Sequence, residues 1–259
     1  MLIDTHCHIH EASYPLNVAE VINRAHLAGV MQMICIGTNV ADSRVALEFA
    51  SNHDGVFASV GVHPHEAKGG FDDLAKIVES GNSSLVAIGE IGLDYHYDHS
   101  PRDIQVQALK VQIELALKYD LPIIFHVREA FDDFWPILDN YTSAGQRIRG
   151  VLHSFTDTIE NAREALKRGL YIGVNGYSTF VSDESQRSMF TTLPMERIIL
   201  ETDAPFLTPA PFRGKVNEPA FVRSVADYHA TIRQISFDEV ANTTTTNARA
   251  LFNLLDKKH

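Results

Sequence analysis

The sequence contains little cysteine. Among 259 residues there are two, Cys7 and Cys35, and they do not form a C-x-x-C pair. A chain of this length can bury a core large enough to need no disulfide bridges, which argues against a small disulfide-stapled secreted fold. We expect two reduced thiols in a cytoplasmic protein.

Long hydrophobic runs are also missing. No apolar run approaches the ~20 residues that a membrane-spanning helix needs. Residues 1–6 show neither the basic region nor the apolar segment of a signal peptide. These absences predict a protein that stays in the cytoplasm and has no membrane partner.

Positive charge is scarce as well. The chain has 22 Lys and Arg against 33 Asp and Glu, for a net charge of −11 with histidine neutral. The electrostatic field of this net negative charge repels phosphate at long range, which excludes a general binder of polyanions. If the substrate is a nucleic acid, local basic groups or bound metal ions must reverse the sign of the field at the site.

Short apolar runs alternate with amphipathic stretches from end to end. We expect strands at residues 2–5, 31–36, 56–62, 85–90, 122–126, 150–153, 170–174 and 197–201. Helical spacing of apolar residues marks 17–27, 42–50, 103–119, 157–166 and 219–232. Strands that alternate with helices predict an α/β fold, a (β/α)₈ TIM barrel of about 250 residues. We expect one such domain over residues 1–259. A doubly wound sheet would alternate in the same way, but no G-x-G-x-x-G follows the first strand.

Histidine is abundant, with thirteen residues, and its placement is informative. Ligand-type side chains stand at the ends of six predicted strands: His6, His8, His63, Glu90, His126, His153 and, just beyond the eighth strand, Asp203. In a closed barrel the carboxyl ends of the strands meet at one mouth. Imidazole and carboxylate are the ligands of Zn²⁺, Mn²⁺ and similar ions. Each histidine alone could equally be a hydrogen-bonded core residue, but the set at the strand ends favours a metal site. Strand alternation places Cys7 on the opposite face from His6 and His8.

Seven motifs carry a resemblance to a known family, in order along almost the whole chain. They are Asp4-Thr5-His6-Cys7-His8, Gly61-Val62-His63-Pro64-His65, Gly89-Glu90-Ile91-Gly92-Leu93-Asp94-Tyr95, His126-Val127-Arg128-Glu129-Ala130, His153-Ser154-Phe155, Glu201-Thr202-Asp203-Ala204-Pro205 and Asn217-Glu218-Pro219. The sequence resembles the TatD-type metal-dependent hydrolases of the amidohydrolase-like barrel superfamily. The resemblance implies hydrolytic activity, with DNA phosphodiesters as the best-attested substrates. It also implies one or two divalent ions (Mg²⁺, Mn²⁺ or Zn²⁺) held by His6, His8, Glu90, His126, His153 and Asp203.

Three positions depart from the family pattern. Val216 stands where many members carry Arg, Ser154 where Cys is common, and Asp157 where Gly is common. None of them is a predicted ligand. The missing arginine removes one cation near the mouth, which leaves phosphate affinity and substrate choice open.

Three of the strand-end residues are candidates for the chemistry itself. Glu90 lies at the centre of the set and could bridge two ions, which would clamp a phosphate and activate water. Asp203 could ligate one ion and accept the proton of the attacking water, or it could cap the turn before Pro205. His63 could hydrogen-bond the scissile phosphate or orient a ligand, with a core histidine as the alternative.

Arg128 is a candidate for holding a phosphate. It lies two residues beyond His126, so it could face the mouth, and the guanidinium group suits phosphate geometry. A salt bridge to Glu129 or Glu201 is the alternative. Glu201 itself would lie deeper in the barrel than Asp203, and a buried carboxylate needs a partner.

Further substrate contacts are predicted around the mouth. Arg213 and Lys215 stand in the Pro-rich loop after the eighth strand, where they could contact the phosphate backbone or simply be solvated. We also assign His65 to the substrate. Aromatic side chains beyond the fourth strand could stack on an unpaired base or pack locally: Tyr95, His96 and Tyr97.

Three functional hypotheses follow. The first is a metal-dependent deoxyribonuclease, and the acidic surface favours an exonuclease that takes single-stranded DNA ends. The second is a hydrolase of another ester or amide, such as D-aminoacyl-tRNA or a small molecule, because one barrel serves many chemistries. The third, a protein whose metal only stabilises the fold, is disfavoured because structural sites are usually closed and Cys-rich. We expect a monomer with no stable protein partner.

Overall fold

Eight parallel strands form the centre of the molecule. The structure is a computed structural model that describes residues 1–97 and 99–254, so the predicted domain end at 259 lies outside the described residues. The strands pair in chain order. They are β1 (Leu2–Cys7), β2 (Val30–Ile36), β3 (Val56–Val60), β4 (Leu85–Asp94), β5 (Ile123–Arg128), β6 (Gly150–Leu152), β7 (Tyr171–Val174) and β8 (Ile198–Leu200). All eight predicted strands are present.

The two edges of the sheet meet and nearly close it into a ring. A parallel bridge joins Cys7 to Ala204, just beyond β8. The Asp203 backbone N–H donates to the His6 carbonyl over 2.8 Å, and the Thr5 hydroxyl donates to the Leu200 carbonyl over 3.1 Å. The predicted TIM barrel is confirmed, and the ends of β1 and β8 therefore lie side by side.

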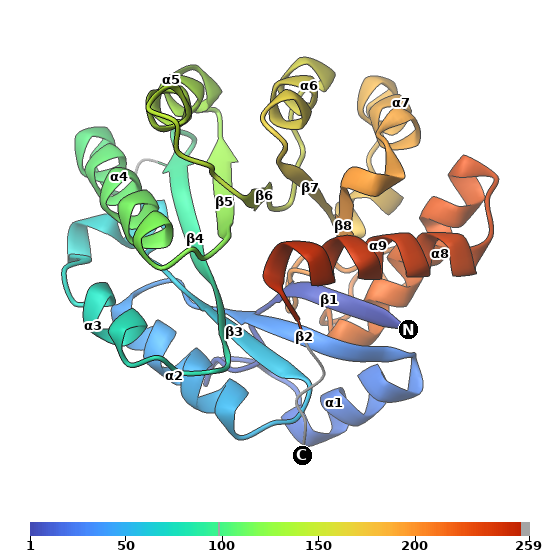
Figure 1. Ribbon diagram of the computed structural model, residues 1–259. Coiled ribbons are helices and arrows are strands. Elements are labelled where there is room, and N and C mark those ends of the chain that lie inside the picture. Colours follow the sequence, from blue (N-terminus) through green and yellow to red (C-terminus); the bar gives the residue numbers. More distant parts are fainter. Residues whose placement is uncertain (98, 255–259) are drawn as a thin grey trace.

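Helices surround this ring of strands (Figure 1). They are α1 (Val18–Leu27), α2 (Val40–Ser51), α3 (Leu74–Glu79), α4 (Arg102–Lys118), α5 (Phe131–Ser143), α6 (Ile159–Lys167), α7 (Glu184–Thr192), α8 (Val222–Arg233) and α9 (Phe237–Phe252). Side-chain oxygens at the N-cap positions accept backbone N–H bonds in α1, α2, α6, α7 and α9, which satisfies donors that a helix start leaves unpaired. Helices α3, α5, α7 and α9 lie outside the five predicted helical ranges. With 6 and 9 residues, α3 and α7 are too short to give a clear apolar period. Within the described residues, no helix is both long and apolar enough to cross a membrane.

The barrel interior is filled with side chains rather than hollow. One buried apolar cluster lies inside the strands and includes Ile3, Ile34 and Ile124, and the last turns of α9 close it with Leu251 and Phe252. A larger cluster fills the layer between strands and helices. It contains Cys7 and Cys35, both free thiols, so Cys7 does face away from the interior as strand alternation predicts. With one end plugged by α9, the open end is the mouth at the carboxyl ends of the strands.

Strand β4 continues four residues further than the sequence predicts. It pairs with β5 up to Asp94 and Arg128, after a register shift between Gly89 and Ile91. Gly92 makes this pairing possible, since a Cβ there would overlap the His126 carbonyl oxygen. The extension matters because it carries Asp94 to the mouth beside His126.

A buried histidine in α8 gives a testable pH dependence of stability. The His229 ring is wholly buried, its Nε2 lies 3.1 Å from the Ser178 hydroxyl, and burial together with the nearby Arg233 charge lowers its pKa to about 3. Because the unfolded chain takes up this proton near pH 6.5 and the folded chain does not, stability is lost as the pH falls below 6.5. The loss is about 1.4 kcal/mol for each pH unit until the folded pKa is approached.

We therefore expect His229→Gln, which keeps a hydrogen-bonding group toward Ser178, to lose less stability than the wild-type protein as the pH falls. The measurement is the free energy of unfolding of metal-free protein by denaturant at pH 7.5, 6 and 5. The wild-type and variant curves should converge as the pH falls. Curves that stay parallel would contradict this assignment.

Candidate functional site

A cavity of about 870 Å³ opens at the mouth of the barrel. Six of the seven strand-end residues named from the sequence line it, and the seventh, His6, lies buried beneath with its ring stacked on that of His153. The lining six are His8, His63, Glu90, His126, His153 and Asp203. Side chains from separate strands thus converge on one volume, as the barrel prediction requires.

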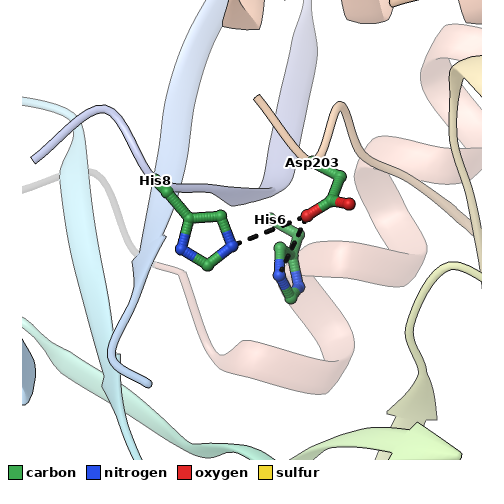
Figure 2. Close-up of side chains that lie close together, drawn as sticks. All are labelled: His6, His8 and Asp203. Atoms are coloured by element: carbon green, nitrogen blue, oxygen red, sulfur yellow. Dashed lines mark ion pairs between the residues drawn. The ribbon is translucent and has the colours of Figure 1, made fainter. Parts of the chain in front are cut away.

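One group of ligand-type side chains joins β1 to the residue that follows β8. Asp203 Oδ1 lies 3.6 Å from His6 Nε2 and 3.5 Å from His8 Nε2, and Figure 2 shows the carboxylate pointing at both rings. Asp203 adopts a φ of 60°, a region that non-glycine residues rarely occupy. The backbone bond from Asp203 to His6 helps hold this conformation and aims the carboxylate at β1.

A second group gathers around Glu90. Its carboxylate lies 2.9 Å from His126 Nδ1, 3.3 Å from His153 Nε2, 3.5 Å from His6 Nε2 and 3.8 Å from His63 Nε2. Glu90 is buried, and His6 belongs to this group as well as to the first. The shared His6 places the two groups side by side.

Electrostatics keep Glu90 ionised. Burial alone would raise the pKa of its carboxyl, but the charge of His153 and the hydrogen bond from His126 hold that pKa well below its ordinary value. An anion at this position is what a cation site needs.

The histidines of the site differ in charge. Burial and the charge of His126 lower the pKa of His63 well below its ordinary value, so His63 is neutral near pH 7. Burial alone would lower the pKa of His153, but the carboxylates of Glu201 and Glu90 raise it to about 10. A cation that binds here therefore displaces a proton, and its affinity rises with pH.

The residues fit a metal ion. Both ring nitrogens of His6 are buried without a hydrogen-bond partner among the described residues, and so is Nδ1 of His8. Buried polar atoms normally have partners, and the 3.5 and 3.6 Å separations from His6 to Glu90 and Asp203 are too long for hydrogen bonds. Three groups bring ligand atoms within 4.8 Å of one another: His6, His8 and Asp203; His6, Glu90 and His153; and His63, Glu90 and His126. Their imidazole and carboxylate donors suit Zn²⁺ and Mn²⁺, with Mg²⁺ favouring the carboxylates.

Glu201 supports this site from below. Its Oε1 lies 3.1 Å from His153 Nδ1 and accepts the Ser154 backbone N–H over 2.6 Å. The buried carboxylate thus has the partners that its burial demands. It turns the Nε2 edge of His153 toward Glu90.

The structure places some of the predicted substrate contacts at the cavity and others away from it. Arg128 and His65 both line the cavity. The Arg128 guanidinium lies 4.7 Å from the centre of the Tyr97 ring, while Glu129 contacts His96 over 2.7 Å instead. Among the three predicted aromatic side chains, Tyr97 is the one that lines the cavity. Tyr95 bonds to Asp133 and packs under Arg102.

Arg213 and Lys215 are not among the described residues that line the cavity. The Arg213 guanidinium lies 3.7 Å from the Phe180 ring centre and donates to the Thr208 carbonyl over 2.9 Å. The Lys215 ammonium lies 5.4 Å from the Phe212 ring centre. Arg213 thus packs against Phe180 and Lys215 against its own loop, rather than toward the ligand groups.

The sequence analysis missed Asp94 as a functional residue. Its Oδ2 lies 2.9 Å from His65 Nε2 and 3.0 Å from His126 Nε2, and its Oδ1 accepts the backbone N–H groups of His96 and Tyr97. Side chains alternate along a strand, so residues four apart, such as Glu90 and Asp94, point to the same face. This spacing could have identified Asp94, but the strand predicted from the sequence ends at Glu90.

Comparisons with known proteins agree with this geometry. The family model described as TatD related DNase matches residues 3–253. The chain belongs to the TatD family. It is 40% identical over 256 residues to a Bacillus subtilis protein named uncharacterized metal-dependent hydrolase YabD, covering 98% of this chain and 100% of that one. It is 37% identical over 248 residues to a protein of Erwinia tasmaniensis named 3′-5′ ssDNA/RNA exonuclease TatD, covering 91% and 93% of the two chains. The crystal structure of YJJV, a TatD homologue from Escherichia coli K12, superposes with a TM-score of 0.91 at 31% identity and 98% coverage of each chain.

This TatD-family chain is therefore a metal-dependent hydrolase, with His, Glu and Asp groups able to bind a metal. Two of its three departures from the family pattern lie at the cavity edge or beyond it. Ser154 lines the cavity, and its hydroxyl accepts a bond of 2.8 Å from the Asn175 side chain. Just before α6, the Asp157 carboxylate accepts the Thr158 backbone N–H and the Asn161 side-chain N–H.

Replacing Asp94 tests whether it positions His126. We expect Asp94→Asn to lower metal affinity or kcat/KM by roughly 10- to 100-fold, because His126 loses the carboxylate that fixes its ring. Calorimetric metal titration measures the affinity directly. Asp120→Asn is a matched control, since Asp120 is exposed and pairs with Arg149 away from the cavity. Wild-type affinity and turnover in Asp94→Asn would show that His126 is oriented without it.

Proposed function

We propose that this protein is an exonuclease that hydrolyses phosphodiester bonds at the ends of single-stranded DNA, using two divalent metal ions. The observation that carries the proposal is the arrangement of His6, which belongs both to the group with His8 and Asp203 and to the group with Glu90 and His153. Two adjacent ligand groups at one open cavity are typical of two-metal phosphodiesterases. The relative named 3′-5′ ssDNA/RNA exonuclease supports a nucleic acid substrate and digestion from the 3′ end.

Divalent ions at these groups would activate a water molecule and neutralise the charge that builds on the phosphoryl oxygens. The chain's own residues supply the rest. Asp203 is ionised at neutral pH because the His8 ring at 3.5 Å and the histidine charges around it outweigh its burial, and it accepts the proton of the attacking water at its carboxylate. Neutral His63 faces the same volume and donates a hydrogen bond to a phosphate oxygen.

Arg128 gives the mouth local positive charge. It is the one Lys or Arg among the described residues that line the cavity. Its position over Tyr97 holds the guanidinium at the rim, where the next phosphate of a bound strand would lie. Since the whole chain carries a net charge of −11, this contact and the bound ions must offset the repulsion of the substrate.

The test uses metal-stripped protein and single-stranded DNA labelled at either the 5′ or the 3′ end. Mg²⁺, Mn²⁺ and Zn²⁺ are added in turn, with Glu90→Gln as the inactive control. We expect metal-dependent release of mononucleotides, with immediate release of a 3′ label and stepwise shortening of the 5′-labelled strand. No release with any ion, from protein shown to bind metal, would overturn the nuclease proposal. Activity on an aminoacyl-tRNA ester or an amide would then identify the substrate.

A further inference from the structure

One large apolar side chain lies exposed at the mouth of the barrel, beside the ligand groups. Phe206 is 59% exposed and lines the cavity three residues after Asp203. Its ring centre lies 6.5 Å from that of His8. Aromatic side chains that face solvent at a binding cavity are typical of ligand contacts rather than of core packing.

The backbone beneath this ring is held firmly although the ring is exposed. The Phe206 N–H donates to the Asp203 carbonyl over 2.8 Å, and the Asn217 side chain donates to the Phe206 carbonyl over 2.5 Å. Asn217 is fully buried and also donates to the Thr202 carbonyl over 2.8 Å. One buried amide thus fixes the loop on both sides of Asp203, so the position of the ring is set relative to that carboxylate.

The faces of the Phe206 ring are also less covered by neighbouring side chains than those of Tyr97, the other exposed aromatic at the mouth. Tyr97 is 50% exposed, but Arg128 lies over its ring at 4.7 Å and His99 is nearly parallel to it at 5.8 Å. The ring contact of Phe206 is an edge contact with His8, at an interplanar angle of 64°. Tyr97 follows β4 and Phe206 follows β8, which are opposite positions in a ring of eight strands.

We propose that Phe206 is the stacking surface for the unpaired nucleobase of the nucleotide whose phosphodiester is hydrolysed. This inference rests on the proposed function, because the ligand groups locate the phosphate next to Asp203. A base attached to that phosphate lies close to it, and Phe206 is an exposed aromatic whose backbone is hydrogen-bonded directly to that of Asp203. Every base has a π-face, so stacking here tolerates any sequence but requires an unpaired base.

Stacking also explains how an acidic protein holds a polyanion. Contacts to phosphate weaken steeply as salt rises, whereas stacking on an apolar ring does not depend on charge. A site that combines Phe206 with few cations gains affinity from the base rather than from the backbone. It therefore distinguishes a frayed or single-stranded end from a duplex, whose bases are already stacked.

The experiment places 2-aminopurine at the 3′-terminal position of a single-stranded oligonucleotide, because its fluorescence is quenched when it stacks. Wild-type holoenzyme should quench the emission on binding. Phe206→Leu should lose the quench and raise KM about tenfold while kcat changes little, and Phe206→Trp should restore both. An oligonucleotide with an abasic 3′ nucleotide should show the same KM with wild type and Phe206→Leu. Leu27→Ala is the control, since Leu27 is 80% exposed at the end of α1 on the outside of the barrel.

The outcomes separate this inference from the proposed function. Wild-type hydrolysis of DNA with no quench, or with the same KM in Phe206→Leu, would overturn the stacking role and leave the nuclease proposal standing. A change in oligomeric state of Phe206→Leu at unchanged KM would overturn it too, and would assign the ring to self-association. If wild-type protein with bound metal neither binds nor cleaves any oligonucleotide, the nuclease proposal fails and the stacking role with it.

Discussion

Replacing Glu90 by glutamine is expected to lower kcat by at least about 10³-fold, which corresponds to ~4 kcal/mol of transition-state stabilisation. The neutral amide keeps the size of the side chain but removes the anion at the centre of the site. It would also remove the negative charge that faces His153 and His126 at 3.3 and 2.9 Å. The same variant should retain less metal after dialysis, as measured by elemental analysis, because Glu90 belongs to two of the three ligand groups.

The matched control for this variant is Glu79→Gln. Glu79 is exposed and pairs with Lys118 on the helix surface, so its replacement should change neither kcat nor metal content. The free energy of unfolding of both variants, measured without metal, separates a loss of fold from a loss of chemistry. Full metal content and wild-type turnover in Glu90→Gln would contradict the central position that the geometry gives this carboxylate.

Replacing Asp203 by asparagine is expected to lower kcat by roughly 10²- to 10⁴-fold, the range observed when a general base is removed. The amide oxygen can still face His6 and His8, but it cannot take the proton of the attacking water. Because His6, His8 and Glu90 remain, metal affinity should fall less than it does in Glu90→Gln. The measurement pairs steady-state kinetics with metal titration, on single-stranded DNA and over pH 5 to 9.

The pH profile separates the two roles of Asp203. In the wild-type protein the His8 ring at 3.5 Å and the histidine charges offset the effect of burial and keep the pKa of Asp203 below its ordinary value. The base that we propose is therefore already ionised at pH 5, and its own titration should not limit the rate above that pH. If Asp203→Asn loses metal and activity in the same proportion, the carboxylate acts as a ligand alone. Asp120→Asn again serves as the control, since that carboxylate lies on the surface.

The sequence by itself determined the barrel and the positions of the ligand-type residues. Alternating apolar runs and helical periods are local patterns, and right-handed connections allow few other arrangements of eight such units. Once the strands are parallel and closed, their carboxyl ends must meet. The convergence of Glu90, His126, His153 and Asp203 follows from strand order alone, so the sequence could predict it without any knowledge of contacts.

The tertiary structure alone decided what lies around that set. Side chains in loops point where long-range contacts hold the backbone, and no local pattern encodes those contacts. Arg213 was predicted to face the substrate, yet Phe180 and the Thr208 carbonyl hold it elsewhere. Phe206, which the sequence did not single out, reaches the mouth because the side chain of Asn217, eleven residues further along the chain, fixes its carbonyl. Asp94 acquires its role only because β4 runs past a bulge and pairs with β5 as far as Arg128.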